Sequence, residues 1–288
     1  MKVKVWGARG SVPSPGPETN RYGGNTSCVE VIADDGTTVI LDGGTGIRNL
    51  GMCVDPGDGP LHILLTHLHL DHIQGLMFFA PLFRPESEVT IWGPASPEAP
   101  LMERIARYIS APLAPVEVRE LPCHLAFHEA EPTEWNIGGL RIRADSVTHR
   151  GPTLGYRVSS GAESVCYIPD HEPGLGVPIC DTDDDWLSGF DLARDASLLV
   201  HDCQYTDEEH RDHLGWGHSA LTDALQFGRR TRAERVALFH HDPLHTDDFL
   251  DGFAGDAAEQ FAELGGDPTQ LQLATERAEI DVTGAPAT

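Results

Sequence analysis

A cluster of side chains able to bind metal ions follows an apolar segment of the chain: His67, His69, Asp71 and His72. The apolar segment, Ile63–Leu65, is typical of a buried strand, and apolar residues at helical spacing begin again at Ile73. The cluster therefore lies on a predicted strand-to-helix turn, where several side chains can converge on one point. Imidazole and carboxylate are ligands that zinc, manganese and iron accept in proteins. Four such groups without partners beside a buried strand would be costly, so a metal site is favoured over structural histidines.

The segment Thr66–His72 resembles the H-x-H-x-D-H signature of the metallo-β-lactamase-fold hydrolases, because the order, the spacing and the preceding apolar strand all agree. The resemblance implies an α/β fold, a four-layer αββα sandwich in which two mixed sheets are flanked by helices. It also implies a site for two divalent metal ions along one edge of the sandwich. We expect Zn²⁺, with Mn²⁺ as the alternative, because the ligand set accepts both.

The composition bounds the organisation and the partners of the chain. Its 288 residues are sufficient for one large domain, predicted over 1–282, with a disordered tail at 283–288. The chain has 20 Lys and Arg against 45 Asp and Glu, a formal net charge of −25. Such a field repels polyanions, so we expect a small substrate rather than a long nucleic acid. The densest basic run, at 229–235, is interpreted as a solvated helix face.

The cysteines and the hydropathy indicate a cytoplasmic enzyme. The six cysteines are scattered singly, without a C-x-x-C pair, and are interpreted as reduced thiols. No apolar run is long enough to span a membrane, and the alternating segment at 2–6 is typical of a strand rather than a signal peptide. We therefore expect no membrane partner.

Patterns along the chain predict an alternation of strands and helices. Strands are expected at 2–6, 27–33, 37–41, 88–92, 140–147, 154–159, 164–168, 197–200 and 235–239. Helices are expected at 73–82, 97–109 and 246–264, and another includes Leu221 and Phe227. The stretch 111–139 is poorly periodic, with a short strand expected at 116–120, and an edge strand is expected within 271–282.

Several predicted strands end in a histidine or an aspartate: His67, His149, Asp170, Asp202 and His240. Loops at strand ends are where α/β folds carry their chemistry. Carried over from the superfamily pattern, the first metal is held by His67, His69 and His149, and the second by Asp71, His72 and His240. Asp170 bridges the two ions, although Asp202 also follows a strand and is the alternative. Asp42, at another strand end, is expected to support the ligand loop.

Two further segments resemble the ribonuclease Z-like branch of this superfamily. Val200–Cys203 is similar to its His-Glu-Ala-Thr segment, with Asp202 in place of the usual Glu, and Gly217–Ser219 is similar to its His-Ser-Thr loop. In that branch the carboxylate and the histidine pair, and the histidine protonates the leaving alkoxide of a phosphodiester. The resemblance thus assigns catalytic roles to Asp202 and His218, and Asp71 is expected to orient the attacking water.

These observations predict a binuclear metal-dependent phosphodiesterase. We expect metal-bound hydroxide to attack a small phosphodiester, with a cyclic nucleotide as the leading candidate and His218 as general acid. The alternatives are a transfer-RNA 3′-end endonuclease, a lactone or thioester hydrolase at the same two metals, and a non-enzymatic metal-binding regulator. No basic arm of the kind that transfer-RNA-processing relatives use is evident, and 111–139 is acidic. The sequence leaves the oligomeric state open, and a homodimer is a candidate because relatives are commonly dimers.

Candidate substrate contacts lie beside the expected ligands: Arg9, Ser219, His241 and His245. The guanidinium groups of Arg9, Arg21 and Arg150 match the geometry of phosphate, so these arginines are candidate phosphate anchors. An ordinary surface arginine is the favoured interpretation for each of the three.

Overall fold

Two mixed β-sheets form the centre of the protein in the computed structural model, which describes residues 1–55 and 59–282. The first sheet has the order β14-β1-β2-β3-β4-β5-β6. Its strands are β1 (Lys2–Gly7), β2 (Cys28–Ile32), β3 (Thr38–Leu41), β4 (Leu61–Leu64), β5 (Glu88–Pro94), β6 (His124–Ala130) and β14 (Glu279–Asp281). The tail predicted at 283–288 lies outside the described residues.

The second sheet has the order β13-β12-β11-β10-β9-β8-β7. Its strands are β7 (Thr133–Ile137), β8 (Leu140–Ser146), β9 (Leu154–Ser160), β10 (Glu163–Ile168), β11 (Leu198–Asp202), β12 (Val236–Phe239) and β13 (Leu271–Leu273). Strands β7 to β10 pair antiparallel, whereas β10 to β13 pair parallel. The first sheet is divided in the same way, since β14 to β3 pair antiparallel and β3 to β6 pair parallel.

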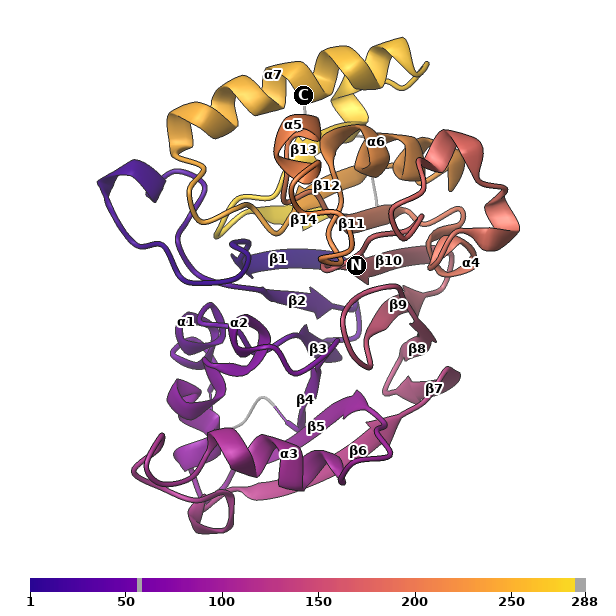
Figure 1. Ribbon diagram of the computed structural model, residues 1–288. Helices are drawn as coiled ribbons and strands as arrows, with labels where there is room; N and C mark the ends of the chain where they lie inside the picture. Colours follow the sequence, from indigo (N-terminus) through magenta and orange to yellow (C-terminus); the bar gives the residue numbers. More distant parts are fainter. Residues whose placement is uncertain (56–58, 283–288) are drawn as a thin grey trace.

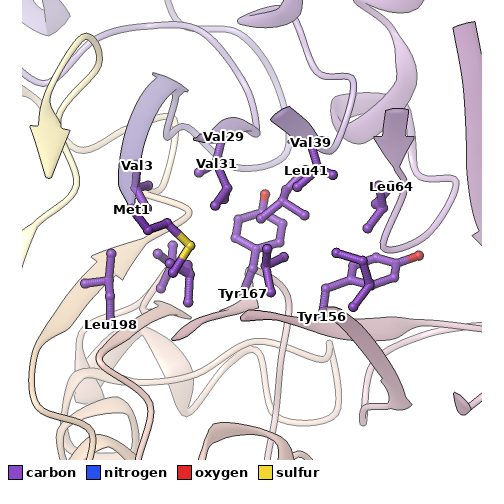
Figure 2. Packing of buried hydrophobic residues seen from close by; sticks show 14 of the residues in the cluster. Met1, Val3, Val29, Val31, Val39, Leu41, Leu64, Tyr156, Tyr167 and Leu198 are labelled. Atoms are coloured by element: carbon purple, nitrogen blue, oxygen red, sulfur yellow. The ribbon is translucent and has the colours of Figure 1, made fainter. Parts of the chain in front are cut away.

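The two sheets pack face to face through their apolar sides. Figure 2 shows Val3, Val31 and Leu41 of the first sheet opposite Tyr167 and Tyr156 of the second. All of these side chains are at most 1% exposed. Valine and aromatic side chains suit a pleated, buried surface, and the apolar area that they bury stabilises the sandwich.

Helices cover the outer face of each sheet. They are α1 (Ile47–Gly51), α2 (Leu70–Ile73), α3 (Leu101–Tyr108), α4 (Phe190–Ala193), α5 (Asp207–His210), α6 (Leu221–Arg230) and α7 (Asp247–Glu263). In Figure 1, α6 and α7 lie at the top and α1 to α3 at the bottom, with the strands between them. Ile105 of α3 packs in a cluster with Ile91 of β5, and Phe261 of α7 with Leu238 of β12. The predicted αββα sandwich is therefore confirmed.

Several element boundaries differ from the sequence prediction. The helix expected at 73–82 is replaced by the short α2 and two 3₁₀ helices, Leu76–Phe78 and Ala80–Phe83. Gly75 and Pro81 account for the interruption, because glycine weakens a helix and proline lacks the N–H donor. Helix α3 begins only after Pro100, four residues later than expected for a helix beginning at Pro97.

The region 111–139, in which the sequence is poorly periodic, contains two strands. Strands β6 and β7 lie within 111–139, and the short strand expected at 116–120 is a 3₁₀ helix, Val118–Glu120. The single edge strand expected within 271–282 is two short strands, β13 and β14, which join different sheets. Among the described residues, no helix is both long and apolar enough to cross a bilayer.

Candidate metal centre

The ends of five strands meet at one edge of the sandwich. Strands β10, β11 and β12 are parallel, and β8 runs in the same direction because β9 is antiparallel to both of its neighbours. Their carboxyl ends therefore lie at the same edge of the second sheet. His149, Asp170, Asp202 and His240 stand at or just beyond these ends. The turn after β4 of the first sheet adds His67 and His69.

One group of side chains surrounds a first point: His67, His69, His149 and Asp170. The Nδ1 atom of His69 lies 2.9 Å from Nε2 of His67 and 3.2 Å from Nε2 of His149. The Oδ2 atom of Asp170 lies 3.6 Å from Nε2 of His67 and 3.5 Å from Nε2 of His149. His69 is exposed, so this group opens to solvent.

A second, fully buried group surrounds a neighbouring point: Asp71, His72, Asp170 and His240. The Oδ2 atom of Asp71 lies 3.2 Å from Nε2 of His72 and 3.1 Å from Nε2 of His240. The other oxygen of Asp170, Oδ1, lies 3.0 Å from Nε2 of His72 and 3.3 Å from Nε2 of His240. Asp170 thus turns one oxygen toward each group. The structure brings together all seven side chains that the resemblance assigned to two metals.

The donor atoms fit two divalent cations. The Nδ1 atoms of His72, His149 and His240 face the acceptors Asp42 Oδ2, Gly217 O and Gln204 Oε1, at 2.8, 2.7 and 3.1 Å. An Nδ1–H that donates to these acceptors leaves the Nε2 lone pair directed at the cluster. The buried Nε2 of His72 and Oδ1 of Asp170 have no hydrogen-bond partner among the described residues. Buried polar atoms without partners are costly, and a cation between them would satisfy both.

The surroundings favour the metal-binding form of several histidines. Burial lowers the pKa of His67, His69 and His149, which keeps their imidazoles neutral. For Asp170, burial would raise the pKa, but nearby His240, His72 and His67 outweigh it and hold the pKa well below its usual range. Neutral imidazoles and an ionised carboxylate are the forms that coordinate metals.

A buried network around Asp42 positions the turn that carries these histidines. Its carboxylate accepts hydrogen bonds from the Thr66 N–H at 2.7 Å and from the Tyr167 hydroxyl at 3.0 Å, and it contacts His72. Asp42 has φ +62° and His240 has φ +64°, a backbone region unfavourable for residues other than glycine. Such strain concentrates at functional sites. The sequence predicted Asp42 as a support, but not Thr66, Tyr167 or Gln204.

The Asp202 carboxylate and the His218 imidazole form a pair beside the cluster. Oδ2 of Asp202 lies 2.7 Å from Nδ1 of His218, so aspartate is long enough to make the contact usually made by glutamate. The same carboxylate accepts backbone N–H groups of His171, Gln204 and Ser219. Burial alone would lower the pKa of His218, but Asp202 outweighs it and raises the pKa to about 9. His218 also stacks on His240, with ring centroids 5.0 Å apart.

The four candidate substrate contacts are buried, and each already contacts other groups of the protein. The Arg9 guanidinium donates to the carbonyl oxygens of Gly23, Asp242 and His245, and none of its surface is exposed. The Ser219 hydroxyl donates to the His171 carbonyl. These placements do not fit direct contact with a substrate, and they indicate that Arg9 and Ser219 position loops instead.

The two remaining histidine candidates are also engaged in the protein interior. His241 contacts the Ala274 carbonyl at 2.8 Å, and burial lowers its pKa to about 3. His245 pairs with Glu209 at 3.0 Å and stacks on Phe249. Neither histidine belongs to the metal-binding groups found among the described residues. Their position in sequence close to His240 does not bring their imidazoles into the metal-binding groups.

Comparisons with known proteins agree with this geometry. A family model described as a beta-lactamase superfamily domain matches residues 37–241. A ribonuclease Z of Kineococcus radiotolerans is 27% identical, over 99% of this chain and 95% of the relative. The metallo-beta-lactamase fold protein YhfI of Bacillus subtilis superposes with a TM-score of 0.69 at 20% identity, covering 97% of this chain and 99% of YhfI. The short form of human tRNase Z superposes with a TM-score of 0.68 at 22% identity, covering 99% and 100%.

The relatives correct one expectation drawn from the composition. A net charge of −25 led us to regard a long nucleic acid as an unsuitable partner. That expectation was wrong as a general rule, because proteins named ribonuclease Z and tRNase Z match nearly the whole chain. Net charge describes the average field of the protein, whereas recognition depends on the local groups around a site. The relatives named ribonuclease Z support the ribonuclease Z-like branch. On its sequence and its fold, the chain belongs to the beta-lactamase superfamily and is a metal-dependent hydrolase.

Proposed function

We propose that this protein is a binuclear metal-dependent phosphodiesterase that cleaves RNA, in the manner of a transfer-RNA 3′-end endonuclease. One observation carries the proposal: His218, paired with Asp202 at 2.7 Å, stands directly beside the seven metal-binding side chains. Hydrolysis of a β-lactam, lactone or thioester needs no such acid, whereas the alkoxide that leaves a phosphodiester benefits from a proton. The names of the relatives support the same choice of substrate.

Each group has a defined role in this proposal. Two divalent cations, when bound, lower the pKa of a water molecule and stabilise negative charge on a phosphoryl group. Asp71 is fixed by the Ser11 N–H, which donates to its Oδ2 at 2.8 Å, so this carboxylate can orient the attacking water. Asp170 turns one oxygen toward each metal-binding group, so it is the carboxylate that would lie between two bound cations and offset their mutual repulsion.

His218 completes the mechanism as general acid. The Asp202 carboxylate accepts the Nδ1–H of His218, which fixes the ring and leaves Nε2–H free to donate. The Asp202 carboxylate raises the pKa of His218 to about 9, which favours the protonated imidazole that the leaving oxygen requires. Asp202 is held in place for this contact, because its carboxylate also accepts hydrogen bonds from the backbone N–H groups of His171 and Gln204.

Turnover of matched substrates by the metal-loaded protein tests this proposal. We expect cleavage of a transfer-RNA precursor with a 3′ extension and of bis-p-nitrophenyl phosphate, and no comparable turnover of a lactone or a thioester. Binding of the precursor should weaken steeply as salt concentration rises. Lactone or thioester turnover without any diester hydrolysis would contradict the proposal. Metal analysis of the purified protein would test Zn²⁺ against Mn²⁺.

A small phosphodiester such as a cyclic nucleotide is the second candidate. The observation that favours it is a cavity of about 420 Å³ beside His67 and His69, which is a volume suited to a small ligand. Cyclic nucleotides included in the same assay distinguish the two candidates. A kcat/KM for a cyclic nucleotide far above that for the precursor would favour this second function.

A further inference from the structure

The cavity beside the metal-binding groups is lined by four separate segments. The turn after β4 contributes His67 and His69, and the loop after β5 contributes Ser96 and Pro97. Helix α3 and the loop after β8 contribute the remaining lining residues. The exposed His69 connects the cavity with the first metal group. A substrate whose scissile phosphorus lies on the metal-binding groups therefore has room to extend into this cavity.

The cavity is locally basic on a strongly acidic protein. Its walls contain one acidic residue, Glu98, against three arginines: Arg104, Arg107 and Arg150. The whole chain has a net charge of −25, so this concentration of positive charge departs from the average field. An anionic group of the substrate would be attracted here and repelled elsewhere.

The three arginines differ in how far they are already engaged. The Arg104 guanidinium donates to the carbonyl oxygens of Ala99 and Pro94 and pairs with Glu129, so it is a structural contact. Arg107 lies three residues further along α3, on the same face, and is exposed. Within the described part of the chain, its guanidinium has no hydrogen bond or ion pair.

Arg150 lines the same cavity from the loop after β8. Its Nε donates to the Gly215 carbonyl at 3.1 Å, which orients the side chain and leaves both terminal nitrogens for a ligand. The residue before it in sequence is His149, one of the metal-binding side chains. Arg150 and Arg107 therefore line one cavity, which the metal-binding residues His67 and His69 also line.

We propose that this cavity is a subsite for a second phosphate of the substrate, the one that flanks the scissile phosphodiester, and that Arg107 and Arg150 bind it. The inference rests on the proposed phosphodiesterase function. A guanidinium fork matches the oxygens of a phosphate, and such charge-assisted contacts are strong. Polynucleotides carry a flanking phosphate at every step, whereas a cyclic mononucleotide carries none. The subsite would thus select polynucleotides over small single diesters.

A pair of synthetic substrates tests the subsite. In both substrates, p-nitrophenol is esterified to a phosphate on thymidine, and only one of the two carries a second phosphate on the other sugar hydroxyl. The pair is made twice, once with the p-nitrophenyl ester at the 5′ position and once with it at the 3′ position. For one of the two ester positions, the metal-loaded wild type should have a kcat/KM about tenfold higher for the substrate with the second phosphate, mainly because its KM is lower. Arg107→Ala and Arg150→Ala should each reduce this preference, and the double variant should abolish it.

Matched variants separate a phosphate contact from a general loss of charge. Arg107→Lys should retain part of the preference, because it keeps the charge but loses the fork. Arg119→Ala should keep all of it, because Arg119 is 80% exposed, pairs with Glu117 and lies outside the cavity. The subsite would be overturned if the wild type showed no preference for the second phosphate at either ester position. It would also be overturned if the double variant of Arg107 and Arg150 kept that preference.

The outcomes also distinguish failure of the subsite from failure of the proposed function. Hydrolysis of both esters without preference contradicts only the subsite, whereas no hydrolysis of any diester contradicts the function. In the second case, calorimetry still tests the cavity with thymidine 3′,5′-bisphosphate against thymidine 5′-monophosphate. The bisphosphate should bind the wild type about tenfold more tightly, and equal affinities would overturn the subsite.

Discussion

The chemistry of His218 depends on one neighbouring carboxylate. The Asp202 side chain is fully buried and contacts Nδ1 of His218, so the imidazole gains a proton that burial alone would disfavour. The ring is held between His240 and His149, each with its centroid 5.0 Å from that of His218. A protonated imidazole fixed beside the metal-binding groups is suited to protonating a departing oxygen.

The importance of that proton should depend on the leaving group. We expect His218→Ala to reduce kcat on an RNA diester by roughly 10²–10⁴-fold, the contribution typical of general acid catalysis. The loss should be much smaller on bis-p-nitrophenyl phosphate, because p-nitrophenolate departs without needing a proton. Steady-state kinetics on both substrates, with metal content measured in parallel, checks this. An equal loss on both would mean that His218 acts on metal binding or folding instead.

The pH dependence of kcat on RNA should show the titration of His218. The acid form is required, so activity is retained below the pKa of His218 and lost as the pH rises through it. That pKa is raised to about 9, and bound cations would lower it because like charges repel. The alkaline limb should therefore fall at or below about pH 9. In Asp202→Asn the limb should move to lower pH, and an unchanged limb would assign it to another group.

The two candidate bridging carboxylates should behave in opposite ways when mutated. Asp170 turns one oxygen toward each metal group, whereas Asp202 is saturated by His218 and backbone N–H groups. We expect Asp170→Asn to lose bound metal, and Asp202→Asn to keep metal with collapsed RNA turnover. Metal analysis of both purified variants is the measurement. Asparagine has nearly the same volume as aspartate, so neither substitution leaves a cavity. If Asp202→Asn lost metal and Asp170→Asn kept it, Asp202 would be the bridging carboxylate and Asp170 the partner of the general acid.

At the scale of elements, the ends of strands determine which residues meet. Apolar runs predicted the strands before His67, Asp202 and His240, and these strands form where expected. The order of ligands along the chain resembled a known family, so the metal-binding set could be proposed from sequence. The supporting contacts of Tyr167 and Gln204 could not, because each depends on a partner from a distant element.

The same limit explains where the structure departs from the expectations drawn from the sequence. Arg9 lies two residues after the end of β1, but its guanidinium donates to the carbonyl oxygens of Asp242 and His245, more than 200 residues away in sequence. Strand β6 alternates between exposed and half-buried residues over His124–His128, but the apolar Ala126 stands on its exposed side, so the sequence shows a short apolar run rather than a clear alternation. Local periodicity identifies elements that bury one face, and it fails where tertiary pairing decides the conformation.

A glycine in the loop before His218 controls the position of a ligand. Gly217 has φ +92°, and a Cβ there would lie 2.3 Å from Nδ1 of His149. We expect Gly217→Ala to displace His149 and to reduce the bound metal toward one equivalent. Gly215→Ala is the matched control, because Gly215 has φ +77° and a Cβ added there would meet no atom within 4 Å. Both variants strain the backbone, so equal loss of metal would attribute the effect to the loop conformation alone.

At the scale of the whole molecule, the metal site joins the two sheets. The turn after β4 of the first sheet contributes His67, His69, Asp71 and His72. The second sheet contributes His149, Asp170 and His240. Bound cations would therefore connect the two layers at the edge where their apolar faces end. Ligands that bind only the folded state stabilise it in proportion to the logarithm of their concentration relative to Kd.

Metal removal should therefore destabilise the entire protein rather than one sheet. With free Zn²⁺ at about 100 times its Kd, binding at one site should add about 2.7 kcal/mol to the free energy of unfolding. Chelation should lower the Tm of a single cooperative transition over the predicted domain, 1–282, as measured by calorimetry. Asp170→Asn should show the low Tm with or without Zn²⁺, since it lacks the carboxylate between the two groups. Two separate transitions, with Zn²⁺ raising only one, would show that the sheets unfold independently and that the cations do not join them.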